Sequence, residues 1–411
     1  MHKLVTLLGR PLYDKEKSEY KEAIYQVEGC EDETPSRYIC LKLNDYIRPD
    51  ELIILGTTGS MWGNFLEYAL IQKQPNLIPS LKNLINQLNI DYKQDTTNQV
   101  DLNSAAEILS NVLDCRCHLH LIPYGRTVEE QTKTLKIMLD LFDPKDVATI
   151  DVTHGLRHLP ILMQQSALLL QSLKNVKINK IYYGALDLTR AGKTPVMQLE
   201  GLLEIDRWTK AFHRYEQDGD YTAFKEPLKN EELPIAALNA LEEAAYYERT
   251  FNLTEAGKKL DIVKGHLPDK FDGIGSFFTE RFKKHITWSD KSNLQKRQGE
   301  LANFYLKNGD FVRACIFALE SFITSLLEKS ELPQQQDYHT RIEAVKDFRK
   351  PFPKSHYRNT KKRLKNYYDR LNFIRNALAH GTEPDISITD LMQNPLKLEK
   401  ELQLLFNRLG I

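Results

Sequence analysis

The sequence predicts two domains of different fold classes, an α/β domain built on a parallel sheet followed by an all-α helical bundle. Three observations lead to this prediction. The chain has 411 residues, more than twice the length of a usual domain. Short apolar strands alternate with helical stretches up to about residue 198, and beyond about residue 200 apolar residues recur only at helical spacing. We therefore predict domains at 1–198 and 235–411, joined by a linker or connecting helix at 199–234.

The first half is expected to alternate strands with helices. The stretches that read as strands, some of them running into polar loops, are 2–9, 51–60, 115–125, 146–155 and 177–186. The stretches that read as helices are 34–47, 63–72, 78–88, 127–142 and 159–174. In the first of these helices, Thr34 is the expected N-cap and Pro35 the first helical residue.

Strands separated by helical crossovers imply a parallel sheet with helices on both faces. In such a sheet, ligands bind outside the carboxyl ends of the strands. The segments 56–62, 123–127 and 153–158 each follow a predicted strand, and we expect them to meet at this edge.

The second half is expected to be entirely helical. Its long helical stretches are 236–260, 294–330 and 359–380. In the last of these, apolar residues form one stripe at helical spacing: Leu364, Tyr367, Leu371, Ile374 and Leu378. The polar segments 216–221 and 225–234 are typical of connectors and set the expected boundary between the halves.

Composition and charge restrict the function only loosely. Lys+Arg and Asp+Glu number 56 each, so the net charge favours neither a nucleic-acid nor a membrane partner. No apolar run approaches the roughly 20 residues of a membrane span, and the N-terminus lacks a signal-peptide pattern. Five cysteines without a framework spacing indicate reduced thiols. We expect a cytoplasmic protein with no membrane partner.

The sequence CRCHLH at 115–120 resembles a zinc-binding pattern. On a strand, however, Cys115 and Cys117 face one side of the sheet while His118 and His120 face the other. Four zinc ligands must converge, which these cannot do. We interpret the segment as a strand and predict no metal.

Two strand-end loops carry groups that suit a polar or anionic ligand. The segment LGTTGSMW at 55–62 offers two glycines and three hydroxyl side chains. The segment DVTHGLRH at 151–158 offers Thr153, His154 and Arg157 beside backbone N–H groups. Neither is a P-loop or a dinucleotide fingerprint. Each loop alone is typical of an ordinary turn, but two at one edge of a parallel sheet indicate a ligand site.

The segment FIRNALAHG, residues 373–381, places three polar side chains at the end of a predicted helix. Asn376 and His380 are four residues apart and share a helix face, and Arg375 lies on the adjoining face. Gly381 is the expected C-cap, so His380 lies in the last turn, where the helix dipole favours the imidazolium form. Basic residues are also common at helix C-termini, which is the structural alternative.

The chemistry of this group matches metal-independent RNA cleavage. Histidine acts as general acid or base, arginine stabilises charge developing on phosphorus, and asparagine orients the phosphate or the histidine. The nucleophile is the RNA 2′-hydroxyl, so DNA is spared. The basic segment 349–370, with interleaved tyrosines, suits a groove for single-stranded RNA.

These residues resemble a known family. RNALAH has the R-N-x-x-x-H form of HEPN ribonucleases. The first half resembles CARF domains, the CRISPR-associated Rossmann-fold sensors, in LLGRPLYDKEKSEY at 7–20, ILGTTGSMW at 54–62 and DVTHGLRHLP at 151–160. The chain thus resembles, over nearly its full length, the CARF–HEPN ribonucleases that accompany type III CRISPR systems.

The resemblance implies a Rossmann-like α/β CARF domain followed by an all-α HEPN domain, with no cofactor. It also implies a homodimer whose paired CARF domains bind a cyclic oligoadenylate at the dimer axis. The HEPN domains would then form one composite site for single-stranded RNA. Two-fold symmetry suits a cyclic ligand with an even number of nucleotides, and we favour tetra-adenylate before hexa-adenylate. Ring size, base preference and assembly beyond a dimer stay open.

The resemblance assigns each functional position of the family to a residue of this sequence. The catalytic positions are Arg375, Asn376 and His380. The ligand-binding positions are Gly9, Arg10, Thr57, Thr58, Gly59, Ser60, Met61, Trp62, Thr153, His154, Gly155 and Arg157. The sequence GRPLY departs from the family pattern, in which a smaller loop residue commonly follows the glycine; this leaves the role of Arg10 open.

The leading hypothesis is therefore an RNA endonuclease of antiviral defence that a cyclic oligoadenylate activates allosterically. Two alternatives remain. One is a ring nuclease that degrades the cyclic oligoadenylate in its CARF domain. The other is a non-catalytic HEPN-type interaction or regulatory protein.

Overall fold

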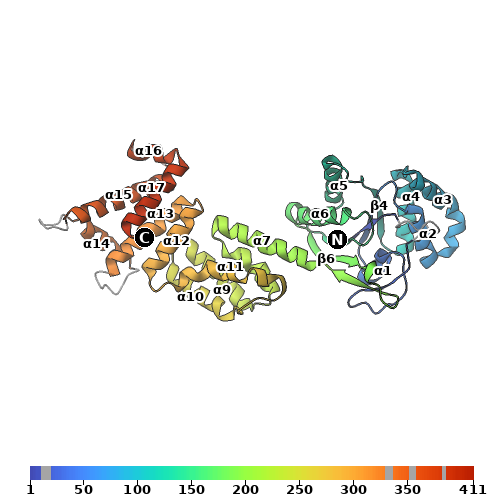
Figure 1. The fold of residues 1–411 in the computed structure, drawn as a ribbon, viewed down its shortest axis with the longest axis horizontal. Helices are drawn as coiled ribbons and strands as arrows, with labels where there is room; N and C mark the ends of the chain where they lie inside the picture. The colour runs from blue at the N-terminus through green and yellow to red at the C-terminus, as the bar shows by residue number, and fades with distance from the viewer. Residues whose placement is uncertain (11–19, 329–336, 351–357, 382–385) are drawn as a thin grey trace. The chain divides into compact units, whose positions relative to one another are not determined.

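The computed structural model describes residues 1–10, 20–328, 337–350, 358–381 and 386–411 (Figure 1). The chain divides into two compact units, Met1–Glu200 and Gly201–Ile411. The strands of the first unit are β1 His2–Leu8, β2 Ile24–Gln26, β3 Glu51–Gly56, β4 Arg116–Leu121, β5 Val147–Asp151, β6 Lys177–Gly184 and β7 Lys193–Gln198. Its α-helices are α1 Ile39–Ile47, α2 Trp62–Lys73, α3 Ile78–Gln94, α4 Gln99–Leu113, α5 Val128–Asp140 and α6 Leu159–Lys174.

The strands of the first unit form one sheet in the order β2-β7-β6-β5-β1-β3-β4. Strand β1 lies between β3 and β5 and runs parallel to both. Leu8 pairs with Gly56 of β3, and Thr6 pairs with Asp151 of β5. The carboxyl ends of these three strands therefore lie side by side, at the point where the strand order reverses and where ligands of such sheets bind.

Helices cover both faces of this sheet, as the sequence predicts. Strands β1 and β3 are buried along almost their whole length, which is typical of central parallel strands. On one face, Leu4, Leu52 and Ile54 belong to the same hydrophobic core as residues of α1, α2 and α4. Figure 1 shows α5 and α6 on the other side of the strands from α2, α3 and α4. The α/β prediction is confirmed.

The sheet also contains elements that the sequence reading missed. Strand β7 runs antiparallel to β6, and the three-residue β2 pairs with β7 at the sheet edge, so the sheet is not wholly parallel. Helix α4 was also missed. Its N-terminus is capped by the side chain of Asn98, which accepts a hydrogen bond from the backbone N–H of Asp101.

The helix expected at 34–47 begins later than predicted. Thr34 donates its backbone N–H and its hydroxyl to the Asp32 carboxylate, which forms a local turn instead of a helix cap. Ser36 pairs with Ala23 as an isolated bridge, and helix α1 starts only after Tyr38. The assignment of Thr34 as N-cap is therefore wrong, because extended pairing and the turn take the residues before Tyr38.

The strand interpretation of CRCHLH is confirmed. Strand β4 carries Cys117, whose sulfur lies 3.8 Å from that of Cys115 on one side. His118 and His120 stack with their ring centroids 6.1 Å apart. The cysteines and the histidines thus form two separate pairs, as strand alternation requires.

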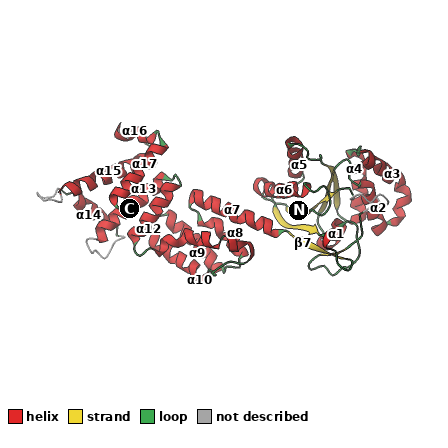
Figure 2. Cartoon of the chain, viewed as in Figure 1, coloured by secondary structure: helices red, strands yellow, loops and turns green. Residues whose placement is uncertain are grey.

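The second unit is helical, as Figure 2 shows. Its longer helices are α7 Glu200–Asp218, α9 Ile235–Arg249, α10 Leu253–His266, α12 Leu294–Lys307, α13 Phe311–Glu328, α14 Tyr338–Arg349, α15 Arg358–His380 and α17 Pro395–Leu409. Its shorter helical segments are η3 Tyr221–Phe224, α8 Lys225–Asn230, η4 Gly273–Phe277, α11 Thr279–Ile286, η5 Thr287–Asp290 and α16 Ile386–Met392. No helix among the described residues combines the length and apolar character needed to cross a membrane.

The segment 199–234, expected as a linker or connecting helix, begins with helix α7 and packs into the second unit. Its helix α7 and the turn after it place five aromatic side chains in the hydrophobic core of the second unit: Trp208, Phe212, Tyr215, Tyr221 and Phe224. The polar stretch that resembled a connector is a tight turn at Gly219, which has a positive φ of 66°. Polar turn residues gave the linker signal, but the aromatic residues on both sides of the turn fold it into the unit.

The predicted apolar stripe of α15 faces the core of the second unit. Leu371 and Ile374 are completely buried, and the other three residues of the stripe pack partly buried against the same cluster. Helix α15 packs on α13 and α17. It ends at His380, and Gly381 follows with a φ of 59°, a left-handed conformation that favours glycine. Both the stripe and the predicted C-cap are confirmed.

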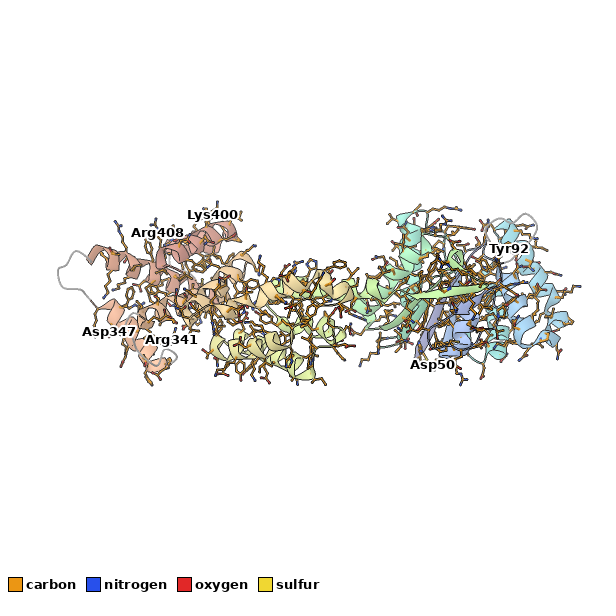
Figure 3. All side chains as sticks on the ribbon, turned by 60° about the horizontal axis from the view of Figure 1, so that its bottom comes forward. Asp50, Tyr92, Arg341, Asp347, Lys400 and Arg408 are labelled. Atoms are coloured by element: carbon orange, nitrogen blue, oxygen red, sulfur yellow. The ribbon has the colours of Figure 1, made fainter. Side chains whose placement is uncertain are left out.

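Helix α14 packs against α13 through its Arg341, which Figure 3 labels together with Asp347 of the same helix. The Arg341 guanidinium pairs with the Glu320 carboxylate at 2.5 Å and donates to the hydroxyl of Thr324 at 3.2 Å. These contacts fix α14 beside the helix on which α15 also packs.

The second unit also contains a completely buried carboxyl group, Glu248 of α9. The hydroxyl of Tyr305 donates to its Oε1 at 2.6 Å, and its Oε2 has no hydrogen-bond partner among the described residues. Burial raises the pKa of Glu248 to about 7, although the hydrogen bond from Tyr305 and the charges of Arg313 and Arg249 act in the opposite direction.

This shift predicts a pH dependence of stability. Because the folded-state pKa of Glu248 lies above its unfolded value, the folded protein holds a proton that the unfolded chain releases above about pH 4.5. The free energy of unfolding should therefore fall by up to about 3 kcal/mol as pH rises from 4.5 to 7. Glu248→Gln should remove this contribution.

The measurement is denaturant unfolding at pH 5 and pH 7.5, followed by tryptophan fluorescence, since Trp208 and Trp288 both lie in this unit. The difference in unfolding free energy between the wild type and Glu248→Gln should change with pH, because all other titrating groups are common to both. A difference that is the same at both pH values would show that Glu248 is ionised in the folded protein.

Candidate functional site

The loops after β1 and β5 touch through their backbones at the carboxyl edge of the sheet. A Cβ atom on Gly9 would lie 2.6 Å from the Cα of Gly155, closer than two such atoms approach. Gly155 itself has a φ of 104°, which side-chain-bearing residues rarely adopt. The backbone N–H of Gly9 donates to the hydroxyl of Tyr20 at 3.1 Å. Two predicted ligand-binding glycines are thus brought into direct contact.

The loop after β3 is held to the end of β1 by its own polar groups. The Ser60 hydroxyl donates to the carbonyl of Leu8 at 2.7 Å and accepts from the Thr57 N–H at 2.9 Å. The Met61 N–H donates to the carbonyl of Gly9 at 3.1 Å, and the Trp62 indole donates to the carbonyl of Thr57 at 2.9 Å. The side chains of Ser60, Met61 and Trp62 are buried, so they shape this loop from below.

The structure places His154 differently from the sequence expectation. Its side chain is 4% exposed and stacks on Tyr20, with ring centroids 4.2 Å apart. Burial lowers the pKa of His154 to about 4, so the ring is neutral near pH 7. It therefore supports the loop instead of presenting a charge at the surface, and its neighbour Arg157 is the exposed basic residue of this loop.

Thr153 also has a supporting role. Its hydroxyl accepts a hydrogen bond from the Gly184 N–H at 2.7 Å. Its own N–H donates to Asp151, whose other carboxylate oxygen accepts from Thr6 at 2.6 Å. Burial raises the pKa of Asp151. These bonds tie the ends of β1, β5 and β6 together beneath the loops.

Arg10 lies at the surface of this edge, in contact with Gly59 and with two residues that the sequence reading did not select, Tyr124 and Asp95. Its Nε donates to the carbonyl of Gly59 at 2.6 Å, and its Nη2 lies 3.4 Å from the hydroxyl of Tyr124 and 3.6 Å from Asp95 Oδ1. The guanidinium of Arg126 lies 4.4 Å from the centre of the Tyr124 ring. The edge therefore gathers two arginines and a tyrosine around one carboxylate.

Asp95 follows helix α3 and has a left-handed φ of 64°. Its Oδ1 accepts hydrogen bonds from the hydroxyls of Thr58 and Tyr124, both at 2.5 Å. Burial opposes ionisation of this carboxyl, but the two hydrogen bonds and the charges of Arg10 and Arg126 lower its pKa. Strand order placed segment 123–127 at this edge, whereas no local pattern indicated Asp95.

The three predicted catalytic residues lie on the last two turns of α15. The Arg375 Nη2 donates to the Asn372 side chain at 2.9 Å, and its buried Nε has no hydrogen-bond partner among the described residues. Its charge acts on the buried Cys315 thiol of α13. Asn376 is half-buried, and His380 is exposed. Arginine is thus hydrogen-bonded within its own helix, whereas histidine is open to solvent.

The basic segment 349–370 lies partly outside the described residues, at 351–357. In the part that the structure describes, several cations have partners. Arg349 pairs with Asp369 at 2.6 Å, and Arg370 pairs with Glu401. The Arg349 guanidinium also lies 5.4 Å from the Tyr368 ring centre. Acidic residues of α15 and α17 therefore neutralise part of the charge that the sequence suggested.

The described parts of the chain show no arrangement of side chains typical of a metal centre. Within them, no group of three or more His, Cys, Asp or Glu side chains is arranged to hold a metal ion. The described polar residues at both candidate sites are instead suited to contacts with anionic and hydroxyl groups.

Comparison with known proteins agrees with the fold of the first unit. Residues 3–187 match the family model described as the CARF domain of the CRISPR system endoribonuclease Csx1. CRISPR-associated protein MJ1674 of Methanocaldococcus jannaschii is 24% identical over 386 residues, which cover 90% of this chain and 60% of that relative. The chain thus spans about 60% of the relative's length.

These matches define the first unit as a CARF domain. The chain is thus similar to CARF-containing CRISPR-associated proteins, and its first unit is followed by a largely helical unit.

Proposed function

We propose that this protein is a metal-independent endonuclease for single-stranded RNA that a cyclic oligoadenylate activates through the CARF domain. The observation that carries the proposal is the end of α15, where Arg375, Asn376 and His380 lie on two turns of one helix in the unit that follows a CARF domain. Type III CRISPR defence is the proposed setting.

The local structure of α15 supports a catalytic role for these residues. Burial of Leu371 and Ile374 fixes the helix on the core, so the orientation of its last turns is set by packing. The unpartnered buried Nε of Arg375 is a donor that an anionic oxygen can satisfy. His380 is exposed at the helix end, where RNA can reach it.

In the proposed reaction, the RNA 2′-hydroxyl attacks the neighbouring phosphorus and the 5′-oxygen leaves. His380 acts on a proton in this step, and the Arg375 guanidinium stabilises the charge that develops on the phosphate oxygens. Asn376 orients the phosphate. The attack and the departure each require a proton transfer, and one chain offers one histidine at this position; we therefore include a homodimer that contributes two sets.

The CARF domain is the proposed sensor. The loops after β1, β3 and β5 present backbone groups, Thr58, Arg10 and Arg157 at the edge where parallel sheets bind ligands. Arginine and backbone N–H groups suit phosphodiesters. Activation is then a coupling between sites: the ligand favours the dimer arrangement in which the two catalytic sets face the same RNA.

The test combines labelled single-stranded RNA with EDTA and a panel of cyclic oligoadenylates. We expect cleavage to appear with one ring size, tetra-adenylate first, and to leave DNA of the same sequence intact. Chromatography of the activator in the same samples shows whether the CARF domain also degrades it. If no ring switches cleavage on at high protein concentration, the nuclease proposal is wrong and a non-catalytic role is supported.

A further inference from the structure

Three donors converge on one carboxylate oxygen at the carboxyl edge of the CARF sheet. They come from three different loops: Arg10 after β1, Thr58 after β3 and Tyr124 after β4. Both hydroxyls donate to Asp95 Oδ1 at 2.5 Å, and the Arg10 Nη2 lies 3.6 Å from it. Arg126, stacked on Tyr124, adds a second positive charge. The arrangement has the composition of an anion-binding position.

The loops build this position from their own contacts. The Arg10 guanidinium lies flat against the backbone of Gly59, where a Cβ atom would come within 1.8 Å of its Nη2. The Gly59 carbonyl also accepts from Arg10 Nε. Glycine therefore permits a contact that holds the guanidinium over the loop, and the two hydroxyls lie beside it.

Unlike Arg10, Thr58 and Tyr124, Asp95 does not lie in a loop that follows a strand. It follows helix α3, and its left-handed backbone conformation directs its side chain toward these three donors. A carboxylate oxygen and a phosphodiester oxygen carry similar charge and accept hydrogen bonds from the same donors. The carboxylate is also 41% exposed, so it can turn into solvent when another anion takes its place.

We propose that Arg10, Thr58 and Tyr124 form a subsite for one phosphate oxygen of the activator, and that Asp95 fills this subsite in the ligand-free protein. The inference rests on the proposed function, because it assigns a residue-level mechanism to the sensor site. Activator binding is then an exchange of one anion for another. Each activator must displace the internal carboxylate, which lowers its apparent affinity.

The test is the affinity for cyclic tetra-adenylate, or for the ring that binds best, measured by calorimetry on the full chain. Asp95→Asn should tighten binding about three- to tenfold, because a neutral amide competes less well for the arginines and does not repel the phosphate. Asparagine also tolerates the left-handed φ, so the turn after α3 is retained. Tyr124→Phe should weaken binding, since it removes a donor from the subsite.

Asp45→Asn is the matched control. Asp45 lies in α1 of the same unit and pairs with Lys73, so this change removes one negative charge without touching the loops. The affinity of Asp45→Asn for the activator should equal that of the wild type. Tighter binding in both variants would indicate general electrostatics and would overturn the proposed exchange.

Whether Asp95→Asn tightens or weakens activator binding distinguishes the proposed exchange from its main alternative. If Asp95 only positions Arg10 for the ligand, Asp95→Asn should bind more weakly than the wild type, which contradicts the inference while leaving the sensor function intact. Unchanged affinity contradicts it as well. If neither protein binds any cyclic oligoadenylate, the proposed sensor function itself is wrong, and the subsite with it.

Discussion

His380→Ala should reduce activator-stimulated RNA cleavage by about 10²- to 10⁴-fold, the usual contribution of a general acid or base. His380 is exposed at the end of α15 and contributes nothing to the core beneath it, so the fold should be unchanged. Affinity for the activator should also be unchanged, because the proposed ligand loops lie in the other unit. Single-turnover cleavage, calorimetry and thermal unfolding provide the three measurements.

His266 supplies a matched control for this variant. It is likewise an exposed histidine at the last position of a helix, α10, in the same unit. His266→Ala should cleave RNA at the wild-type rate. Cleavage that survives in His380→Ala would place the active site elsewhere, and loss in both variants would indicate a general effect of histidine removal.

Gly9→Ala should weaken activation through the CARF domain. The new Cβ would lie 2.6 Å from the Cα and 2.8 Å from the backbone N of Gly155, and neither atom belongs to a side chain that can turn aside. The loops after β1 and β5 must therefore move apart, at a cost of about 1–3 kcal/mol for such overpacking. We expect activator affinity to fall at least about tenfold, because the ligand-facing backbone groups lose their spacing.

Gly265→Ala is the comparison. Gly265 lies in α10, and a Cβ there meets no atom within 4 Å. This change should leave activator affinity unchanged and slightly favour the helix, since alanine is the better helix former. If Gly9→Ala binds the activator as tightly as the wild type, the junction of these two loops is not part of the ligand site.

The spacing of apolar residues along the sequence predicted much of the fold. Buried strands such as β1 and β3 are continuous apolar runs, and the stripe of α15 recurs every three or four residues, so both patterns are visible locally. The start of α1 was misjudged. Thr34 resembled a helix cap, but it forms a local turn with Asp32, and Ser36 pairs with Ala23, which lies 13 residues earlier in the chain.

The same distinction applies to the candidate sites. Strand order placed the loops after β3, β4 and β5 at one edge, and helix spacing placed Asn376 and His380 on one face. The burial of His154 against Tyr20 followed from no local pattern. Nor did the effect of the Arg375 charge on the pKa of the buried Cys315 thiol, because these two residues are separated along the chain.

The sequence by itself determined the two fold classes, the edge of the sheet at which a ligand is expected and the helix end that carries Arg375, Asn376 and His380. Each of these depends on spacing along the chain. Only the tertiary structure decided which side chains support the loops and which face solvent, and it alone brought Asp95 to Arg10, Thr58 and Tyr124. That contact joins α3 to loops far away in the sequence, so packing sets it and local periodicity does not.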